Sequence, residues 1–302
     1  MYRTMNHENK RRSFIKGTAA LAATSLLLPG CKGDPAKAIV EEVVAPPSLD
    51  KFGIQLYTLR DDIPKDPKSV ITKLSTFGYN QIEGYEGDQG IFWNMKPKEF
   101  KGFINDLGIE MVSSHCDIHE GFERKAAEAA EAGLSYLICP FIGPQKSVDA
   151  WKEVTDKFNA CGKICKQNGI RFAYHNHEYS FVPFSGMIPQ DFMMENTDPD
   201  FVDHEMDIYW VITGGADPIA YLDKYPNRFR LCHVKDRMKN AGDEKQASCN
   251  LGTGIIDFPT ILSKAKDRGM QYFIMEQERY DETTPIESAQ IGANYLKELR
   301  FT

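Results

Sequence analysis

The sequence predicts an α/β chain that folds as a single-domain (β/α)8 TIM barrel. Three observations lead to this prediction. Short apolar, strand-like runs alternate with longer helical runs through residues 50–302. Several helical runs end in a glycine that leads directly into the next strand. Polar residues gather at the ends of nearly all strands, and active sites of barrels lie at that end.

The expected elements form eight strand–helix units over about 250 residues, the usual size of such a barrel. The predicted strands lie near residues 52–57, 80–84, 109–115, 135–141, 170–177, 202–208, 229–235 and 271–276. The predicted helices lie near residues 66–77, 97–107, 121–132, 147–168, 217–224 and 257–268, with a short helix near 189–194 and a last helix at 285–299.

The junctions between helices and strands follow a repeated pattern. A glycine accepts the left-handed conformation that closes a helix, and five predicted helices end in one: Gly78, Gly108, Gly133, Gly169 and Gly269. Pro199 and Pro226 mark the turns before the sixth and seventh strands. A doubly wound open sheet has the same junctions, but the polar strand ends favour the barrel.

Composition excludes some classes of function. The 302 residues are 42% apolar and 26% charged, as in ordinary globular proteins, and the net charge is -7. Residues 1–30 carry five basic side chains and one acidic side chain, so the remainder carries about -11, which argues against a nucleic-acid partner. No G-x-G-x-x-G follows the first strand and no Walker loop is present, which disfavours nucleotide binding. Gly252-Thr253-Gly254 indicates a loop turn more than a phosphate site.

The N-terminal residues are predicted to be an export signal. Residues 10–16, KRRSFIK, resemble a twin-arginine signal, and the apolar or small residues 18–28 are too few to span a bilayer. Residues 28–31, LPGC, resemble a bacterial lipobox with Cys31 as the lipidated first residue. We therefore expect a signal peptide at 1–31, a flexible tether at 32–49 and a catalytic barrel at 50–302. The expected location is periplasmic or outer-membrane, held only through the lipid anchor; an ordinary cleaved signal with an incidental cysteine is the alternative.

The other six cysteines show no C-x-x-C spacing of a zinc or redox site. Cys161 and Cys165 lie four residues apart on a predicted helix and are expected to be neighbouring free thiols. A disulfide within this set remains the alternative.

Four successive strand ends carry groups that bind metals and transfer protons. The fifth strand ends in YHNHE, and alternation along a strand places His175 and His177 on one side. Later strands contribute Asp203, Glu205 and Asp207 on one face, then His233 and Lys235 on one face, and finally Glu276. Such a mixed set of nitrogen and oxygen ligands fits one divalent metal. Buried, hydrogen-bonded polar residues are the alternative interpretation of any one strand.

Several stretches resemble the xylose-isomerase-like barrels, a family that includes sugar phosphate isomerases/epimerases, inosose dehydratases and ketose 3-epimerases. The stretches are GIQLYTLRDD at 53–62, YHNHE at 174–178, ENTDP at 195–199, EMDIYWV at 205–211, GGADPIAYLDKYPNRF at 214–229, CHVKD at 232–236, LGTGIIDF at 251–258 and MEQE at 275–278. The resemblance implies a divalent metal held by Asp207, His233, Glu276 and a residue of the fifth strand. That last residue is usually a Glu, and His175 stands in its place.

The resemblance also implies chemistry next to a sugar carbonyl. Glu276 is the expected base and Lys235 the expected donor to a substrate oxygen; the alternative for Lys235 is a salt bridge to Asp207 or Glu276. Glu83 and His115 are candidates for a second acid/base, or rim residues. The candidates for substrate binding are Gln55, Tyr57, His177 and Trp210, and ordinary barrel packing is the alternative.

The expected activity is a metal-dependent sugar isomerase/epimerase that acts by removing a proton next to the carbonyl. Since His175 replaces one of two metal-bound carboxylates, a dehydratase/lyase acting on a keto-sugar, keto-glycoside or inosose is the alternative. A sugar-binding lipoprotein without catalysis is a second alternative. We expect Mn, Co, Fe, Ni or Zn rather than Mg, because imidazole contributes to the site. The expected partner is a small sugar, not a sugar phosphate, because the protein is expected to be exported; the oligomeric state stays open.

Overall fold

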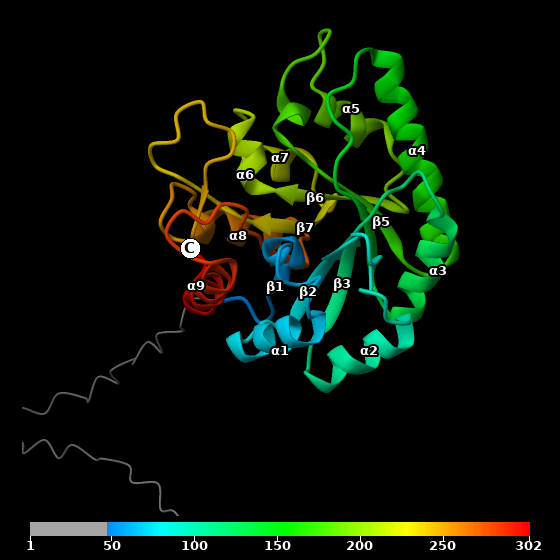
Figure 1. The fold of residues 1–302 in the computed structure, drawn as a ribbon. Coiled ribbons are helices and arrows are strands. Elements are labelled where there is room, and N and C mark those ends of the chain that lie inside the picture. Colours follow the sequence, from blue (N-terminus) through cyan, green and yellow to red (C-terminus); the bar gives the residue numbers. More distant parts are fainter. Residues whose placement is uncertain (1–46) are drawn as a thin grey trace, which may run out of the picture. The chain divides into compact units, whose positions relative to one another are not determined.

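Eight parallel strands close into a barrel, with the helices on its outside (Figure 1). The computed structural model describes residues 47–302. Each strand pairs with its neighbours in sequence order, and the last strand returns to pair with the first. The barrel strands are β1 (Gly53–Gln55), β2 (Gln81–Tyr85), β3 (Glu110–His115), β4 (Tyr136–Cys139), β5 (Arg171–His175), β6 (Val202–Asp207), β7 (Phe229–Val234) and β10 (Tyr272–Met275). The predicted (β/α)8 barrel is confirmed.

The helices agree with the predicted segments to within about two residues at their ends, the usual uncertainty of such boundaries. They are α1 (Pro67–Phe77), α2 (Pro97–Asp106), α3 (Phe122–Ala132), α4 (Val148–Gln167), α5 (Pro189–Asn196), α7 (Pro218–Lys224), α8 (Phe258–Asp267) and α9 (Pro285–Glu298). In the closed ring, α9 packs beside α1.

Four short elements were not predicted. They are the 3-10 helices η1 (Leu56–Leu59) and η2 (Glu178–Phe181), helix α6 (Ile208–Thr213), and a two-stranded ribbon of β8 (Asp236–Arg237) and β9 (Ser248–Cys249). The α6 sequence IYWVIT is aromatic and β-branched, so its composition favours a strand. The Asp207 side chain nevertheless accepts a hydrogen bond from the Trp210 backbone N–H and starts a helix there.

Helix ends carry the signals that the sequence suggests. Side chains of Asp66, Ser147 and Asp257 cap α1, α4 and α8, and Thr284 forms a capping box with Glu287 at α9. Gly133 closes α3 with a φ of 88°, a conformation that a side chain would strain. These ends set where each strand begins and so keep the strand ends in register at one rim.

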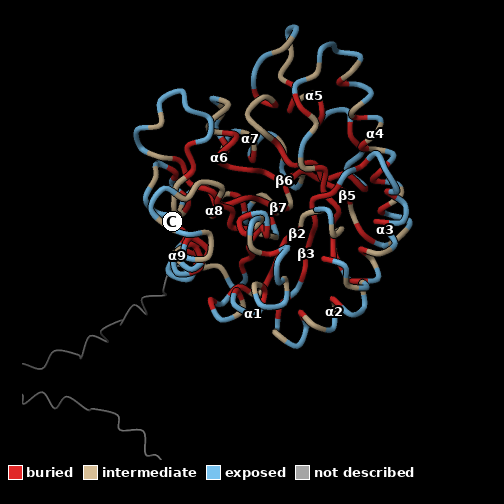
Figure 2. The backbone as a smooth tube through the Cα atoms, viewed as in Figure 1, coloured by how far each residue is buried: buried red, intermediate tan, exposed pale blue. Residues whose placement is uncertain are grey.

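The core has two parts. Inside the barrel, Tyr136, Ile138, Ala173 and Leu231 pack together at the amino-terminal end of the strands, and the larger cluster fills the space between strands and helices. Figure 2 shows the strands buried and the outer helix faces exposed. Because the amino-terminal half is filled, functional groups can meet only at the carboxyl-terminal half.

Asp203 belongs to the amino-terminal end rather than to the functional end. Its carboxylate accepts hydrogen bonds from the Tyr136 hydroxyl at 2.9 Å and from Arg171 Nη2 at 2.9 Å. Asp203, Glu205 and Asp207 share one face of β6, as alternation predicts, but they lie at different distances along the barrel axis. Asp203 is near the start of β6 and Asp207 is at its end. Asp203 is therefore a structural residue that closes the barrel floor.

The Gly252–Gly254 loop is a turn, as predicted. The backbone N–H groups of Gly252 and Gly254 both donate to Asp236 Oδ2, at 3.0 and 2.9 Å. A Cβ on Gly254 would lie only 2.2 Å from Asp236 Oδ1, so the close approach requires glycine. These N–H groups are therefore engaged by the protein's own carboxylate.

The predicted signal peptide, the lipidated Cys31 and most of the 32–49 tether lie outside the described residues. The barrel begins slightly before residue 50, since Pro47 O accepts a hydrogen bond from Phe301 N at 2.8 Å and Leu49 packs against the core. Within residues 47–302, no helix has the length and apolarity needed to span a membrane. The six cysteines of this region are free thiols, so Cys161 and Cys165 are unpaired as expected.

Candidate active site and metal centre

Four side chains from neighbouring strand ends converge on one point. They are His175, Asp207, His233 and Glu276, and one ligand atom from each lies within 4.8 Å of the others. His175 Nε2 lies 3.1 Å from His233 Nδ1 and 3.4 Å from Asp207 Oδ2. His233 Nδ1 lies 3.6 Å from Asp207 Oδ2 and 3.2 Å from Glu276 Oε2. Ligand atoms around a four-coordinate zinc ion are about 3.3 Å apart, so this set has the spacing of a divalent metal site.

The surroundings orient each ligand atom toward that point. His175 Nδ1 donates to the Pro140 carbonyl oxygen at 3.2 Å, and His233 Nε2 donates to Glu83 Oε1 at 2.7 Å. Each imidazole therefore turns its other nitrogen toward the site. Asp207 Oδ1 accepts from Trp210 N, while Asp207 Oδ2 is buried without a hydrogen-bond partner. An orphaned carboxylate oxygen beside two imidazole nitrogens fits a cation.

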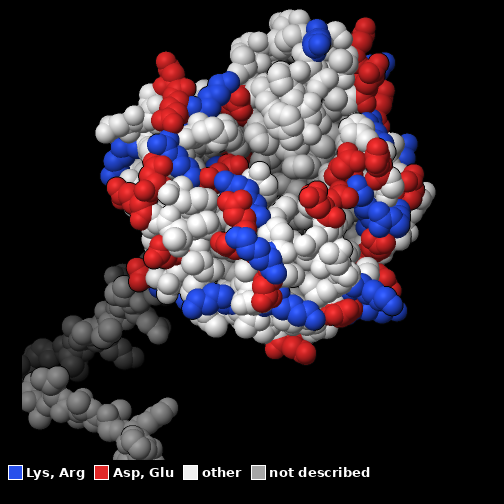
Figure 3. Space-filling view, in the orientation of Figure 1, with Lys and Arg blue, Asp and Glu red and all other residues white. Residues whose placement is uncertain are grey.

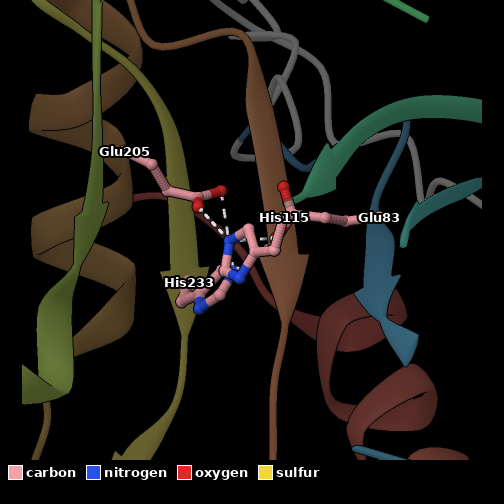
Figure 4. Close-up of side chains that lie close together, drawn as sticks. All are labelled: Glu83, His115, Glu205 and His233. Atoms are coloured by element: carbon pink, nitrogen blue, oxygen red, sulfur yellow. Dashed lines mark hydrogen bonds and ion pairs between the residues drawn. The ribbon is translucent and has the colours of Figure 1, made fainter. Parts of the chain in front are cut away.

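A second polar group lies behind the first and shares His233 with it (Figure 4). His115 Nε2 lies 2.9 Å from Glu205 Oε2 and 3.2 Å from Glu83 Oε1. Glu83 also accepts hydrogen bonds from Gln55 Nε2 at 2.7 Å and from Ser113 Oγ at 2.5 Å. This group fixes the orientation of His233 from the interior of the barrel.

Burial and mutual repulsion perturb the titration of this second group. Burial, and then repulsion from Glu83, raises the pKa of Glu205 to about 7, against the opposing effect of His233 and His115. Burial tends to lower the pKa of His115, but Glu83 and Glu205 outweigh it and raise that pKa to about 9. A protonated His115 between two carboxylates keeps the interior charge balanced.

The two histidines of the YHNHE stretch are neutral. Burial is the main cause that lowers the pKa of His175, and burial followed by repulsion from His175 lowers that of His177 to about 2. The His177 ring stands nearly perpendicular to that of His175, with centroids 5.0 Å apart. Its Nδ1 atom is buried without a partner. His177 therefore keeps a free hydrogen-bonding group beside the site.

Lys235 lies against the acidic residues, so the salt-bridge alternative is confirmed as a contact. Its Nζ atom lies 3.3 Å from Glu276 Oε2 and 3.8 Å from Asp207 Oδ2, and it pairs with Glu278. Burial alone would lower the pKa of Lys235, but Glu276, Glu278 and Asp207 raise it above its ordinary value. The side chain is therefore a buried ammonium group that balances the charge of the carboxylates around the site.

A cavity of about 330 Å³ opens above the four convergent side chains. Tyr57, His115, His177 and Trp210 line it, as predicted, together with His175 and Glu276. The volume lies near the lower end of the range for small-molecule sites, about 300–1,000 Å³. The cavity therefore has room for one sugar ring next to the candidate metal site.

Three of the residues predicted to bind or act on the substrate do not line this cavity: Gln55, Glu83 and Lys235. Gln55 and Glu83 are fully buried, and neither lines it. Gln55 is bound to Glu83 through Nε2 and to the Tyr57 backbone N–H through Oε1. We predicted that Gln55 binds the substrate and that Glu83 acts on it as an acid/base, but the structure places both side chains behind the cavity. Both residues support His233 from behind.

Two acidic residues of the site are missing from the predicted set. Glu205 holds His115, and Glu278 lines the cavity and pairs with Lys235. Alternation carried the signal for both, because Glu205 shares a face with Asp207 and Glu278 shares one with Glu276. The sequence does not reveal which partner each carboxylate finds across the barrel.

Comparisons with known proteins agree with the fold. The xylose isomerase-like TIM barrel family model matches residues 71–299. The inosose dehydratase of Geobacillus kaustophilus is 23% identical over 288 residues, which cover 80% of this chain and 91% of that protein. The inosose dehydratase of Salmonella typhimurium is 28% identical over 176 residues, and this match spans 52% of this chain and 56% of that relative's length.

Solved structures give the same result. A sugar phosphate isomerase/epimerase from Parabacteroides distasonis superposes with a TM-score of 0.71 and 26% identity, covering 82% of this chain and 98% of that one. The IolI protein, whose crystal structure has a bound zinc atom, shares the fold with a TM-score of 0.66 and 15% identity, covering 83% of this chain and 99% of its own. The chain described here belongs to the xylose isomerase-like TIM barrel family.

Proposed function

We propose that this protein is a metal-dependent dehydratase/lyase that removes the proton next to a sugar ketone and then expels the group on the β carbon. The observation that carries the proposal is the spacing of His175 Nε2, Asp207 Oδ2, His233 Nδ1 and Glu276 Oε2 beneath a ring-sized cavity. A divalent metal held by these four atoms would supply a Lewis acid for the substrate carbonyl. Two imidazoles favour zinc or another transition metal over magnesium, and the bound zinc of IolI supports that choice.

The protein's own residues supply the proton transfer. Glu276 is the base, because its carboxylate belongs to the convergent group and also lines the cavity. The Lys235 ammonium group lies beside Glu276 and would offset the negative charge that develops when the proton leaves, and Glu278 holds Lys235 in place. His177 and Trp210 form one cavity wall, with ring centroids 5.3 Å apart. That wall offers an aromatic face to C–H groups and the free His177 Nδ1 to a hydroxyl.

His175 favours elimination over stereo-inversion at one carbon. In the epimerases that this family includes, a Glu at this position is one of two metal-bound carboxylates that move a proton between the two faces of the substrate. His175 would not replace that carboxylate as a base, because its Nδ1 donates to the Pro140 carbonyl oxygen and its Nε2 would be held by the metal. Removal of one proton followed by loss of the β substituent needs only one base. The inosose dehydratases among the relatives support this choice.

The test is a screen of inososes, keto-sugars and keto-glycosides with the metal-loaded protein. We expect an α,β-unsaturated ketone, which absorbs in the ultraviolet, to form from at least one of them. Removal of the metal should stop its formation and the added metal should restore it. Glu276→Gln should lower turnover more than substrate affinity, with the metal content measured alongside because the change also removes a ligand charge. Isomerised sugars without any unsaturated product would contradict the proposal.

A further inference from the structure

A second cavity of about 550 Å³ adjoins the one above the candidate metal site. It lies among the loop after β4, the segment around η2, and the start of α5. Figure 3 shows a broad area without charged side chains in the region of α5. Among the residues that line this cavity, the charged ones are Glu178, Lys245 and Glu278. Lys245 Nζ and Glu178 Oε1 pair with each other at 2.9 Å, so most of the wall is uncharged.

The two cavities share a wall. Phe141, His177, Trp210 and Glu278 line both of them. A substituent on that side of a molecule bound above the metal site would therefore point toward the second cavity. The larger volume of the second cavity shows that the substituent can be at least as large as the sugar ring.

The shared wall and the second cavity present aromatic rings. The Phe141 side chain is 59% exposed, which is unusual for so large an apolar group, and its ring stands perpendicular to those of His177 and Tyr179 at 5.1 and 5.5 Å. His177 and Tyr179 are parallel to each other within 3°. The buried nitrogen Trp151 Nε1 has no hydrogen-bond partner, and Trp151 also lines the second cavity. Aromatic faces and unpaired donors together suit a ring with a flat apolar face and polar edges.

We propose that the second cavity binds the leaving group, and that the leaving group is a ring joined to the reacting sugar through a glycosidic oxygen. This inference rests on the proposed function. For a 3-keto-glycoside, the base removes the proton from C2, and the electron pair of that C–H bond forms the C1=C2 double bond. The C1–O bond breaks, and the glycosidic oxygen leaves with its electron pair and takes up a proton. The products are an unsaturated ketone and an alcohol or phenol, so the step needs no oxidant, reductant or water.

The experiment separates ring binding from turnover. Phenyl glucoside has the ring but no ketone, so it cannot be eliminated, and glucose is its counterpart without the ring. For turnover, 3-keto-glucose loses water, whereas its phenyl and glucosyl glycosides lose phenol and glucose. The protein is the metal-loaded full chain, and binding is measured by calorimetry. The phenyl and glucosyl arms decide between an aromatic and a sugar leaving group.

Val182→Arg is the diagnostic variant, and Ile255→Arg is its matched control. Val182 is 49% exposed and lines the second cavity but not the first. Ile255 is similarly exposed, at 52%, and lines neither. Because both side chains reach solvent, an arginine at either position should be tolerated by the fold, which thermal unfolding checks. In Val182→Arg, the long side chain fills the cavity and competes with the ring.

We expect Val182→Arg to weaken phenyl glucoside binding by about tenfold relative to glucose, the scale of losing part of one buried ring. The kcat/KM ratio of the glycosides to 3-keto-glucose should fall by a similar factor, and Ile255→Arg should change neither ratio. If Val182→Arg and the parent protein had the same binding ratio of phenyl glucoside to glucose and the same kcat/KM ratio of glycosides to 3-keto-glucose, the inference would be overturned. The proposed elimination reaction would be unaffected by that result. A second outcome is that phenyl glucoside binds in a Val182-dependent way but no keto compound is eliminated. That outcome would overturn both the proposed function and the leaving-group role of the second cavity, which would then be only a ring-binding site.

Discussion

His175 Nε2 lies 3.1 Å from His233 Nδ1, and the opposite nitrogen of each ring donates to an oxygen, of Pro140 and of Glu83 respectively. Either a proton on His233 Nδ1 or a metal cation must lie between two nitrogens at this separation; burial tends to lower the pKa of His233, but Glu205 and Glu276 outweigh it and raise that pKa well above 6.5. Asp207 Oδ2 and Glu276 Oε2 face the same point. The four atoms are therefore placed so that a divalent cation can take the position of that proton.

The first prediction concerns these ligands. His233→Ala should abolish stoichiometric metal binding, because it removes the ligand atom Nδ1 from the site. It also removes the one side chain that the two polar groups share. His175→Glu should retain the metal, since a carboxylate is the usual ligand of this family at that position. Elemental analysis of the purified, folded variants measures both. A folded His233→Ala variant that keeps one metal per chain would show that the site is elsewhere.

The second prediction separates support from catalysis at Glu83. Glu83→Gln removes the negative charge that holds the Nε2 proton of His233, so metal affinity should fall by about 10- to 100-fold. The metal affinity is measured by competition with a chelator. Glu110→Gln is the control, because Glu110 begins the next strand but pairs only with exposed Lys51. An unchanged metal affinity together with a large loss of kcat would return Glu83 to the acid/base role predicted from the sequence.

The third prediction concerns pH and His204, which is fully buried on β6. Burial, assisted by Arg228, lowers the pKa of His204 well below 6.5, so the ring stays neutral in the folded state. The unfolded chain takes up this proton below its ordinary pKa of about 6.5, and stability is therefore lost as the pH falls through that value. Relative to His204→Asn, the free energy of unfolding of the parent protein should fall by up to about 1.4 kcal/mol per pH unit below 6.5.

Denaturant titrations of both proteins between about pH 5 and pH 8 measure this difference. Both carry the same metal load, so the other titrating groups affect them alike. A difference that stays constant with pH would mean that His204 titrates normally in the folded protein.

The sequence predicts the barrel and the metal-ligand set because both depend on local patterns. Period-two alternation and the glycine junctions locate the strand ends, and parallel strands bring those ends to one rim. This rule brings Asp207, His233 and Glu276 to the rim, and the family resemblance then selects them as the expected ligands. Alternation does not give depth, so it could not separate Asp203 at the barrel floor from Asp207 at the site.

Packing across the barrel decides what the sequence leaves open. Gln55 ends β1 and Glu83 lies in the middle of β2; Gln55 binds Glu83 and Glu83 binds His233, so neither side chain faces the cavity. Helix α6 forms although its composition favours a strand, because Asp207 caps it. In each case a contact between distant or competing groups outweighs the local preference.

The fourth prediction concerns the N-terminus. We propose that Cys31 anchors the mature protein to a membrane, since residues 10–31 resemble a twin-arginine signal with a lipobox. Cys31→Ala should move the protein from the membrane fraction to the soluble fraction of the native host, with the barrel still folded. Mass spectrometry of the membrane-associated protein checks the same point. Finding Met1 still present on it would end the proposal.

The fate of the substrate's α hydrogen in deuterated water tests the central claim most directly. With a keto-glycoside and the metal-loaded protein, we predict an unsaturated ketone absorbing in the ultraviolet, and any exchange into remaining substrate should label the α carbon with retained configuration. This result follows from a single base on one face, because His175 replaces the second carboxylate. Rapid inversion at that carbon, with deuterium in the inverted product, would contradict the account and show that a second group delivers the proton from the opposite face.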